Sequence, residues 1–453
     1  MRIARSLSVL VILLELSWAS AGVVRAASTW RSETDAGWKA LQTGRLEEAD
    51  RHFRAAVQKA EAFGRNDPRL ALSLDNLAWL EYRRGKFARA IPSARRSLAI
   101  RERISGPESR EAAQSLSTLA IVLAAQGKYA EAEPLLQRTL AITERRLGAE
   151  HPEVALHLSN LAELYRLRAR YAETEPLYRR ALEIIQKRQG ADHPNTAQAL
   201  HNLALLYHIL GRYPEAEALY RQALAIRERH ADAEPAELAQ TVQGLGELDR
   251  LRSRLDEAAA HFERARALRE KTLGFDHPAL AQTLAHLAAL EAERQRYDRA
   301  QALFDRALAI QRKTLGPDHP LTAETLVSLA DLQRRRGRFP EAEPLFHQAL
   351  AHLEKALGPD HPLVAEGFDR CAVLATEMGQ HAEAEILLRR ALAIQQKALG
   401  PNHPVLATTH DHLSDLFRKK GKTEDAAKSH AQAQAIRQRH TQSLVEPAPP
   451  TPS

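Results

Sequence analysis

The chain has 453 residues, with 64 Lys and Arg against 57 Asp and Glu, one Cys, and aromatic residues at 5%. A single Cys excludes an intramolecular disulfide and a cysteine-rich structural zinc site, and the 20 Gly and 22 Pro are too few for a collagen-like or low-complexity chain. The formal net charge of +7 is mild for this length, and 27% charged residues together with abundant Ala and Leu favour long helices.

The first 26 residues are predicted to be a secretory signal peptide. Arg2 and Arg5 precede an apolar run over residues 7–14, and small residues follow, so that cleavage after Ala21 or after Ala26 would be acceptable. The apolar run is too short to span a bilayer comfortably. We therefore expect a secreted or periplasmic mature chain with no membrane span, and a cytoplasmic location is the alternative if the segment is not cleaved.

A tract of the form Leu-Gly-x-x-His-Pro returns along the chain with a period of 42 residues. Its His residues, at 42-residue intervals or multiples of them, are His151, His193, His277, His319, His361 and His403. Degenerate copies lie in register at Asp67, Ser109 and Pro235. Because no insertion interrupts the period between 67 and 403, this span leaves no room for a separate catalytic domain.

Each period is predicted to hold a helix, a tight turn, a second helix and a loop. Apolar residues at spacings of three and four indicate two amphipathic helices. Gly stands at most of the turns, as at Gly211, but Ala169, Ser253 and Gln295 replace it, so we expect that the turn does not strictly need a positive φ. Leu-Gly is expected to end the second helix and His-Pro to begin the next one.

Two series of small residues mark positions where the helices should cross closely. The first comprises Ala49, Ala90, Ala132, Thr174, Ala216, Ala258, Ala300, Ala342, Ala384 and Ala426, and the second Ala56, Ala181, Ala223, Ala265, Ala307, Ala349, Ala391 and Ala433. A bulky residue at either series should overpack a helix contact, at a cost of roughly 1 to 3 kcal/mol. Cys371 stands where other repeats have Leu, so it is predicted to be a buried thiol.

These positions resemble the tetratricopeptide repeat, a helix pair with the same alternation of small and large residues. The 42-residue period and the tract Glu-Ala-Glu-Pro-Leu at 131–135 and 341–345 are similar to the kinesin light chain subfamily of these repeats. The resemblance covers residues 33–440 and implies an all-α, right-handed superhelical solenoid of about ten helix pairs, with a concave groove that binds peptides or partner proteins. Stacking is required because a lone helix pair cannot bury its apolar stripe. Residues 441–453 are Pro-rich and are predicted to be a disordered tail.

No catalytic, cofactor or metal site is predicted. The chain has no phosphate-binding Gly loop, no His-Glu-x-x-His and no Gly-x-Ser-x-Gly. Neighbouring helices lie roughly 8 to 10 Å apart, whereas zinc ligands lie about 2 Å from the metal, so one His per repeat should start a helix and not bind metal. Nucleic acid is not expected as a partner, because the extended basic patch that it requires is absent.

Candidate peptide-binding residues come from the first helix of each repeat. Asn76, Asn160 and Asn202 precede the recurrent Leu-Ala pair, and an amide can hold an extended backbone because it both donates and accepts. In the repeats that this chain resembles, Asn at this place contacts peptide backbone. The other candidates, beside these positions or six residues beyond them, are His201, Arg166, His208, Arg250 and Arg334. This basic lining suggests that the bound peptides are acidic. The helix dipole also favours cations at these helix ends whatever the partner, and a solvated helix face is the alternative.

The sequence therefore predicts a non-enzymatic interaction scaffold that binds extended peptide segments or partner proteins, without a cofactor. One alternative is a regulatory subunit of an enzyme or sensor supplied in trans, and another is a cytosolic adaptor. A third is an enzyme site assembled in the groove around His410, His412 and Asp415. The oligomeric state is left open by the sequence.

Overall fold

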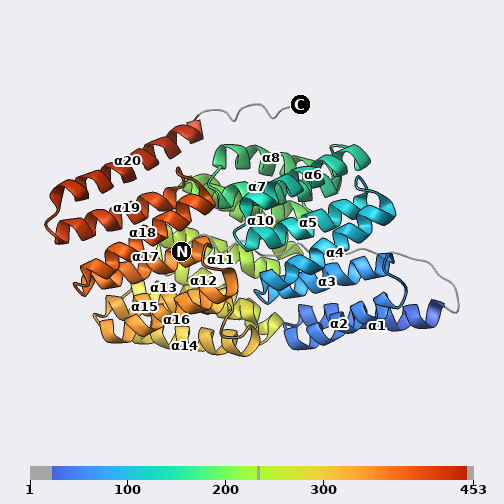
Figure 1. The fold of residues 1–453 in the computed structure, drawn as a ribbon, viewed down its shortest axis with the longest axis horizontal. Helices are drawn as coiled ribbons and strands as arrows, with labels where there is room; N and C mark the ends of the chain where they lie inside the picture. The colour runs from blue at the N-terminus through green and yellow to red at the C-terminus, as the bar shows by residue number, and fades with distance from the viewer. Residues whose placement is uncertain (1–22, 232–234, 446–453) are drawn as a thin grey trace. The chain divides into compact units, whose positions relative to one another are not determined.

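The computed structural model describes residues 23–231 and 235–445, and this part of the chain forms twenty α-helices and no strand (Figure 1). The chain divides into two compact units, residues 1–149 and 150–453. The first unit contains three helix pairs, α1 (Val23–Gln42) with α2 (Leu46–Glu61), α3 (Pro68–Arg83) with α4 (Phe87–Ser105), and α5 (Arg110–Ala125) with α6 (Tyr129–Leu147).

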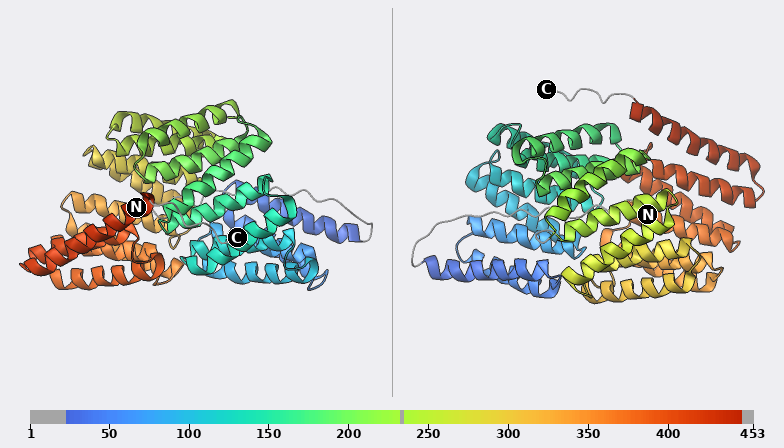
Figure 2. Two further views of the ribbon diagram at one scale, coloured as in Figure 1. Left: turned by 90° about the horizontal axis from the view of Figure 1, so that it is seen from above. Right: turned by 180° about the vertical axis from the view of Figure 1, so that it is seen from behind.

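The second unit contains seven helix pairs, drawn from two further directions in Figure 2. They are α7 (Pro152–Leu167) with α8 (Tyr171–Gln189), α9 (Pro194–Ile209) with α10 (Tyr213–Arg229), α11 (Pro235–Leu251) with α12 (Leu255–Leu273), α13 (Pro278–Glu293) with α14 (Tyr297–Thr314), α15 (Pro320–Arg335) with α16 (Phe339–Leu357), α17 (Pro362–Glu377) with α18 (His381–Leu399), and α19 (Pro404–Lys419) with α20 (Thr423–Val445). The predicted all-α fold of ten helix pairs is confirmed.

The ends of the helical array differ from the predicted boundaries. α1 begins at Val23, ahead of the predicted start at 33, and α20 continues to Val445, beyond the predicted end at 440. The remainder of the predicted signal peptide, residues 1–22, and of the predicted tail, residues 446–453, lies outside the described residues. Among the described helices, none is both long enough and apolar enough to cross a membrane.

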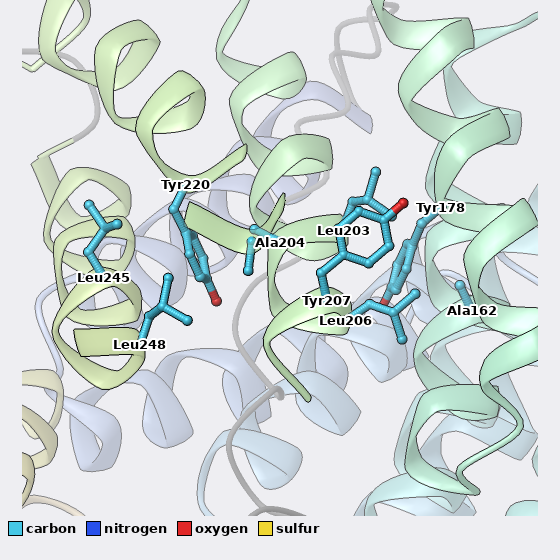
Figure 3. Packing of buried hydrophobic residues seen from close by; sticks show 10 residues of the cluster. Ala162, Tyr178, Leu203, Ala204, Leu206, Tyr207, Tyr220, Leu245 and Leu248 are labelled. Carbon is cyan, nitrogen blue, oxygen red and sulfur yellow. The ribbon is translucent and has the colours of Figure 1, made fainter. Parts of the chain in front are cut away.

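Neighbouring helix pairs share one core, as the stacking argument requires. In the second unit a single cluster joins five consecutive helices, α7 to α11 (Figure 3). Its members include Ala162, Tyr178, Leu203, Ala204, Leu206, Tyr207, Tyr220, Leu245 and Leu248. Both series of small residues are buried, with exposures of at most 4% in the first and 1% in the second, which confirms that they mark close helix contacts.

The recurrent His residues begin the first helices of the second unit, as predicted. At each of the six positions the Nδ1 atom accepts a hydrogen bond from the backbone N–H two residues later, over distances of 3.0 to 3.3 Å. A ring nitrogen that accepts a hydrogen bond carries no proton, so the cap requires a neutral imidazole whose single proton is on Nε2. The Pro that follows is compatible with the first helical turn.

The cap at His403 should fail in acid. Burial is the largest cause that lowers the pKa of His403, to about 4. The folded pKa lies below the ordinary value near ~6.5, so the stability that the neutral ring contributes is present above that pH and is lost as the pH falls toward 4. We expect His403→Ala to lower the free energy of unfolding by about 1 kcal/mol at pH 7.5 and by progressively less below pH 6. Urea denaturation at several pH values measures this difference.

The matched control is His403→Asn, because an Asn side chain can cap the helix and does not titrate. Relative to this variant, the natural chain should lose stability between pH 6.5 and 4. A constant difference across that range would contradict the role of the neutral ring.

The prediction that the turn between paired helices tolerates a negative φ is wrong. Ala169, Ser253 and Gln295 have φ values of 54°, 59° and 60°, in the same left-handed region as the Gly residues of the other turns. In each turn the next residue donates its N–H to a carbonyl five positions back, as from Arg296 to Glu291 at 2.8 Å. This hydrogen bond requires a backbone in the left-handed region at that position, whatever side chain the residue carries.

Gln295→Gly should therefore stabilise the protein. A side chain in the left-handed region costs roughly 1 to 2 kcal/mol, and the Gln295 side chain is exposed, so its removal gives up little buried area. We expect the free energy of unfolding to rise by about 1 kcal/mol, after allowance for the greater freedom of Gly in the unfolded chain. Gln295→Ala is the control in the same denaturation experiment, since it removes the side chain but keeps the strain. Equal effects of Gly and Ala would contradict this explanation.

Candidate functional site

First helices of successive repeats in the second unit meet along one face, here called the inner face. Its side chains pair across neighbouring repeats: Arg334 Nη1 lies 2.7 Å from Glu377 Oε1, and His412 Nδ1 lies 2.9 Å from Asp369 Oδ2. Residues 75, 76, 79, 82 and 83 of α3 serve to number the positions of a first helix. The inner face is formed by the residues that lie at 42-residue intervals from these five. All the predicted site residues fall on these positions: the Asn residues on 76 and its equivalents, His201 on an equivalent of 75, and Arg166, His208, Arg250 and Arg334 on equivalents of 82.

Two of the candidate amides lie on neighbouring first helices. Asn160 is on α7 and Asn202 is on α9, both are partly buried, and these two helices are in contact. The Oδ1 atom of Asn202 accepts a hydrogen bond from Gln198 Nε2 at 2.8 Å. Asn76 belongs to α3 in the first unit, where it is 5% exposed and its Nδ2 atom has no hydrogen-bond partner. Asn160 and Asn202 therefore form one candidate site, and Asn76 belongs to a separate one.

The two candidate His residues lie within the packing of α9 and not on an open surface. His201 and His208 are 6% and 8% exposed. The His201 ring meets Tyr220 edge to face, with 5.3 Å between centroids. Burial, followed by the nearby Arg227, lowers the pKa of His201 to about 3, so the ring is neutral at physiological pH.

The three candidate Arg residues are each engaged by carboxylates. Arg166 is 5% exposed and forms a two-point ion pair with Glu163, through Nη2 at 2.6 Å and Nε at 2.7 Å. Burial alone would lower the pKa of Arg166, but attraction to Glu163 outweighs burial and raises it. Arg250 pairs with Glu247 and Glu293, and Arg334 pairs with Asp331 and Glu377. The predicted basic lining is consequently balanced by acidic groups of the same face.

Sequence reasoning missed a buried polar network across α11, α12 and α13. His286 Nδ1 contacts Glu247, and Gln243 donates from Nε2 to His286 Nε2 at 3.2 Å. The Oε1 atom of Gln243 in turn accepts from Arg269 Nη1 at 2.6 Å. Arg269 is 5% exposed, and this burial lowers its pKa to about 10. The signal that could have revealed the network is the recurrence of acid and cation pairs 39 or 43 residues apart, which is three residues fewer or one residue more than the 42-residue period.

The residues considered for metal binding or catalysis were His410, His412, Asp415 and Cys371. Among the residues that the structure describes, no group of three or more His, Cys, Asp or Glu is arranged to hold a metal ion. In the alternative enzyme site, His412 pairs with Asp369, and Asp415 pairs with Arg418 at 2.6 Å. Cys371 is 6% exposed, and burial raises its pKa to about 12, which confirms the predicted buried thiol.

Comparison with protein families agrees with the repeat geometry. A profile described as tetratricopeptide repeat matches residues 40–103, 111–173, 153–229, 280–355, 325–397 and 370–439, and a second of the same description matches 238–279. The chain belongs to the tetratricopeptide repeat family. The predicted resemblance is thereby confirmed. No curated protein matches the chain.

Several solved structures are similar to this tetratricopeptide repeat protein. BtubC (BKLC) from P. vanneervenii is 26% identical and covers 52% of this chain and 92% of its own, with a TM-score of 0.40. A putative kinesin light chain with nearly identical repeats from Podospora anserina is 24% identical, with coverages of 55% and 98% and a TM-score of 0.29. The Rap conjugation gene regulator of plasmid pLS20, solved with the Phr* peptide, is 13% identical, with coverages of 81% and 96% and a TM-score of 0.50.

Proposed function

We propose that this protein is a non-enzymatic interaction module that binds extended peptide segments or partner proteins on the inner face of its second unit. The observation that carries the proposal is the placement of Asn160 and Asn202, two partly buried amides on adjacent first helices. Each amide can donate to a carbonyl and accept from an N–H of an extended backbone. The Rap regulator of similar fold was solved with a bound peptide, which supports peptides as the ligand class.

The partner should not need to be acidic. Carboxylates of the inner face already pair with Arg166, Arg250 and Arg334. An acidic ligand would have to displace these carboxylates before it could bind the Arg side chains. Exposed charges are screened by salt, whereas hydrogen bonds from amides are much less affected. We therefore expect affinity for a partner to change little between 50 and 300 mM salt.

We also propose a secreted or periplasmic location, on the basis of the predicted signal peptide. N-terminal sequencing of the mature protein from its native cells tests this location. A first residue at Gly22 or Ala27 supports export, and a chain that begins at Met1 or Arg2 contradicts it.

Affinity capture from the native cell-envelope fraction tests the binding function. The intact chain is compared with Asn160→Ala combined with Asn202→Ala, and retained proteins are identified by mass spectrometry. The matched control is Asn195→Ala combined with Asn402→Ala, which makes the same chemical change at two exposed positions outside the inner face.

We expect at least one protein to be retained by the intact chain and by the control, and to be lost from the Asn160 and Asn202 variant. All three forms must show the same helical circular dichroism. Identical retention by all three, or retention by none, would contradict the proposal. If the retained partner is an enzyme and this chain alters its activity, this chain is a regulatory subunit of that enzyme.

A further inference from the structure

The first and the last helix pairs of the second unit meet. α20 contacts α8, although the five pairs from α9 to α18 separate them along the chain. The Tyr171 ring, at the start of α8, meets the His440 ring of α20 edge to face, with 5.3 Å between centroids and 75° between planes. We call this meeting of α7 and α8 with α19 and α20 the seam.

A second contact of the seam involves His403, which begins α19. Its Nδ1 atom accepts from the Val405 N–H at 3.3 Å, so Nε2 carries the proton of the neutral ring. Burial has the largest effect on the pKa of His403 and lowers it, and a hydrogen bond to the backbone of Leu167, the last residue of α7, acts in the opposite direction. Leu167 is 8% exposed, whereas Ile209 and Leu251 at the same position of the next two first helices are partly exposed. This difference is expected for a residue that the seam covers.

The sequence of the last helix supports the seam. His440 stands where the preceding repeat has Ala398, and Gln442 replaces the Gly400 that ends α18. Without that Gly, α20 runs for 23 residues, to Val445, whereas α18 has 19. His440 therefore lies more than one turn inside a continuous helix, which holds its ring in place.

The seam completes a circuit of first helices. Contacts join α7 to α9, α9 to α11, and then α13, α15, α17 and α19 in turn, while His286 of α13 reaches Glu247 of α11. Among the described residues, no comparable contact joins successive second helices of this unit, so the array curves toward its first helices. Since the seam returns from α19 and α20 to α7 and α8, the second unit closes into a ring with the inner face on the inside.

The inside of the ring suits a single extended chain. Helices in contact lie roughly 8 to 10 Å apart, so a circuit of seven first helices is roughly 20 Å across between opposite axes. A helix with its side chains is 10 to 12 Å wide, which leaves roughly 10 Å between opposite helix surfaces. Asn202, Leu205 and Val373 of the inner face are partly exposed to this space. A folded domain is too wide to enter it.

A closed ring restricts which segments reach the inner face. A segment with a free end can thread into the ring along its axis. A segment with a folded domain on each side cannot thread, and it enters only if the seam opens. The seam is held by one ring pair and one His contact, whereas α18 and α19 share a buried cluster that includes Leu388, Leu413 and Leu416. The seam is therefore the part of the ring that substitution can open without unfolding the helix pairs.

We propose that the seam makes the second unit selective for chain ends. The ring admits free peptides and the terminal segments of partner proteins, and it excludes internal segments that lie between folded domains. Tyr171 and His440 hold the seam closed, together with His403 at the end of α7. The inference rests on the proposed function, because it specifies which extended segments can reach Asn160 and Asn202.

Thiol labelling of the inner face tests the proposal in the full chain. Leu205→Cys places a thiol on the inner face of α9, and the natural chain, whose Cys371 is 6% exposed, gives the background rate. One probe is a Gly-Ser peptide with a maleimide beside its free end, and the other carries the same peptide and maleimide between two folded domains. We expect the free-ended probe to label position 205 roughly tenfold faster or more, the equivalent of about 1.4 kcal/mol in the barrier to access.

Two pairs of substitutions relate this selectivity to the seam. Tyr171→Ala combined with His440→Ala should let both probes label position 205 at similar rates. The matched control is Tyr213→Ala combined with His230→Ala, the same changes at the equivalent positions of α10, and it should keep the selectivity. Gln222→Cys, on the exposed surface of α10, should react equally with both probes in every background. Each variant must keep the helical circular dichroism of the natural chain.

Equal labelling of position 205 by the two probes in the natural seam would overturn the proposal. So would labelling by neither probe, or selectivity that persists when Tyr171 and His440 are both replaced. These outcomes leave the proposed function intact, because labelling measures access and the capture experiment measures binding through Asn160 and Asn202. Loss of the captured partner would likewise leave the selectivity of the ring unchanged.

Discussion

Phe262→Ala is expected to lower the free energy of unfolding by roughly 3 to 5 kcal/mol, the range for loss of a fully buried aromatic ring. Phe262 lies in α12, is 0% exposed, and packs in one cluster with Leu287 and Leu290 of α13. Its ring also covers Gly246 of α11, where a Cβ atom would lie 2.9 Å from the ring. The residue thus joins three consecutive helices, and guanidinium denaturation followed by circular dichroism measures its loss.

A double-mutant cycle with Gly246→Ala separates packing from a general loss of apolar area. In the natural chain, Gly246→Ala forces the Phe262 ring to move and should be destabilising. In the Phe262→Ala background the added methyl group enters the vacated space, so its cost should shrink or change sign. Additive effects would show that Phe262 and Gly246 do not pack as described.

Gly358→Ala is expected to cost about 1 to 3 kcal/mol through backbone strain alone. Gly358 ends α16 with φ 89° and ψ 159°, a region that only Gly occupies readily. No atom lies within 4 Å of a Cβ built there, so steric crowding does not contribute. The denaturation midpoint in guanidinium reports the loss.

Gly367→Ala in α17 is the control, because its φ is helical and the nearest contact is the flexible end of Leu350 at 3.1 Å. Ala is the better helix former by about 1 kcal/mol, which offsets that close contact, so this variant should stay near the stability of the natural chain. Equal losses at Gly358 and Gly367 would contradict the strain argument.

Much of the fold could be predicted because the residues at each helix end determine where that helix begins or stops. The His-Pro pairs supply a capping acceptor and a residue suited to a first turn, and the Leu-Gly pairs supply the backbone that ends a helix. Side-chain preference alone does not predict φ at the turns of Ala169, Ser253 and Gln295. Closure of the helix pair by backbone hydrogen bonds determines φ there, and the residue adapts at some cost in strain.

The candidate site was only partly predictable, for a geometric reason. The repeat period alone places Asn160 and Asn202 on adjacent helices. His201 occupies an inner-face position, the equivalent of 75, yet it is 6% exposed because its ring packs against Tyr220 of the next helix, a contact that the repeat period does not reveal. The pairing of Arg250 with Glu293 depends on the offset between two helices, which the sequence of either helix does not contain.

Site-specific photocrosslinking tests most directly whether partners bind the inner face. A photoreactive amino acid is placed at Leu205, on the inner face of α9 between Asn202 and His208, or at Gln222, on the exposed surface of α10. After incubation with the native cell-envelope fraction and irradiation, we expect adducts with a partner from position 205 and not from position 222. Adducts from position 222 alone, or equal adducts from both, would contradict the central claim that the inner face of the second unit is the binding surface.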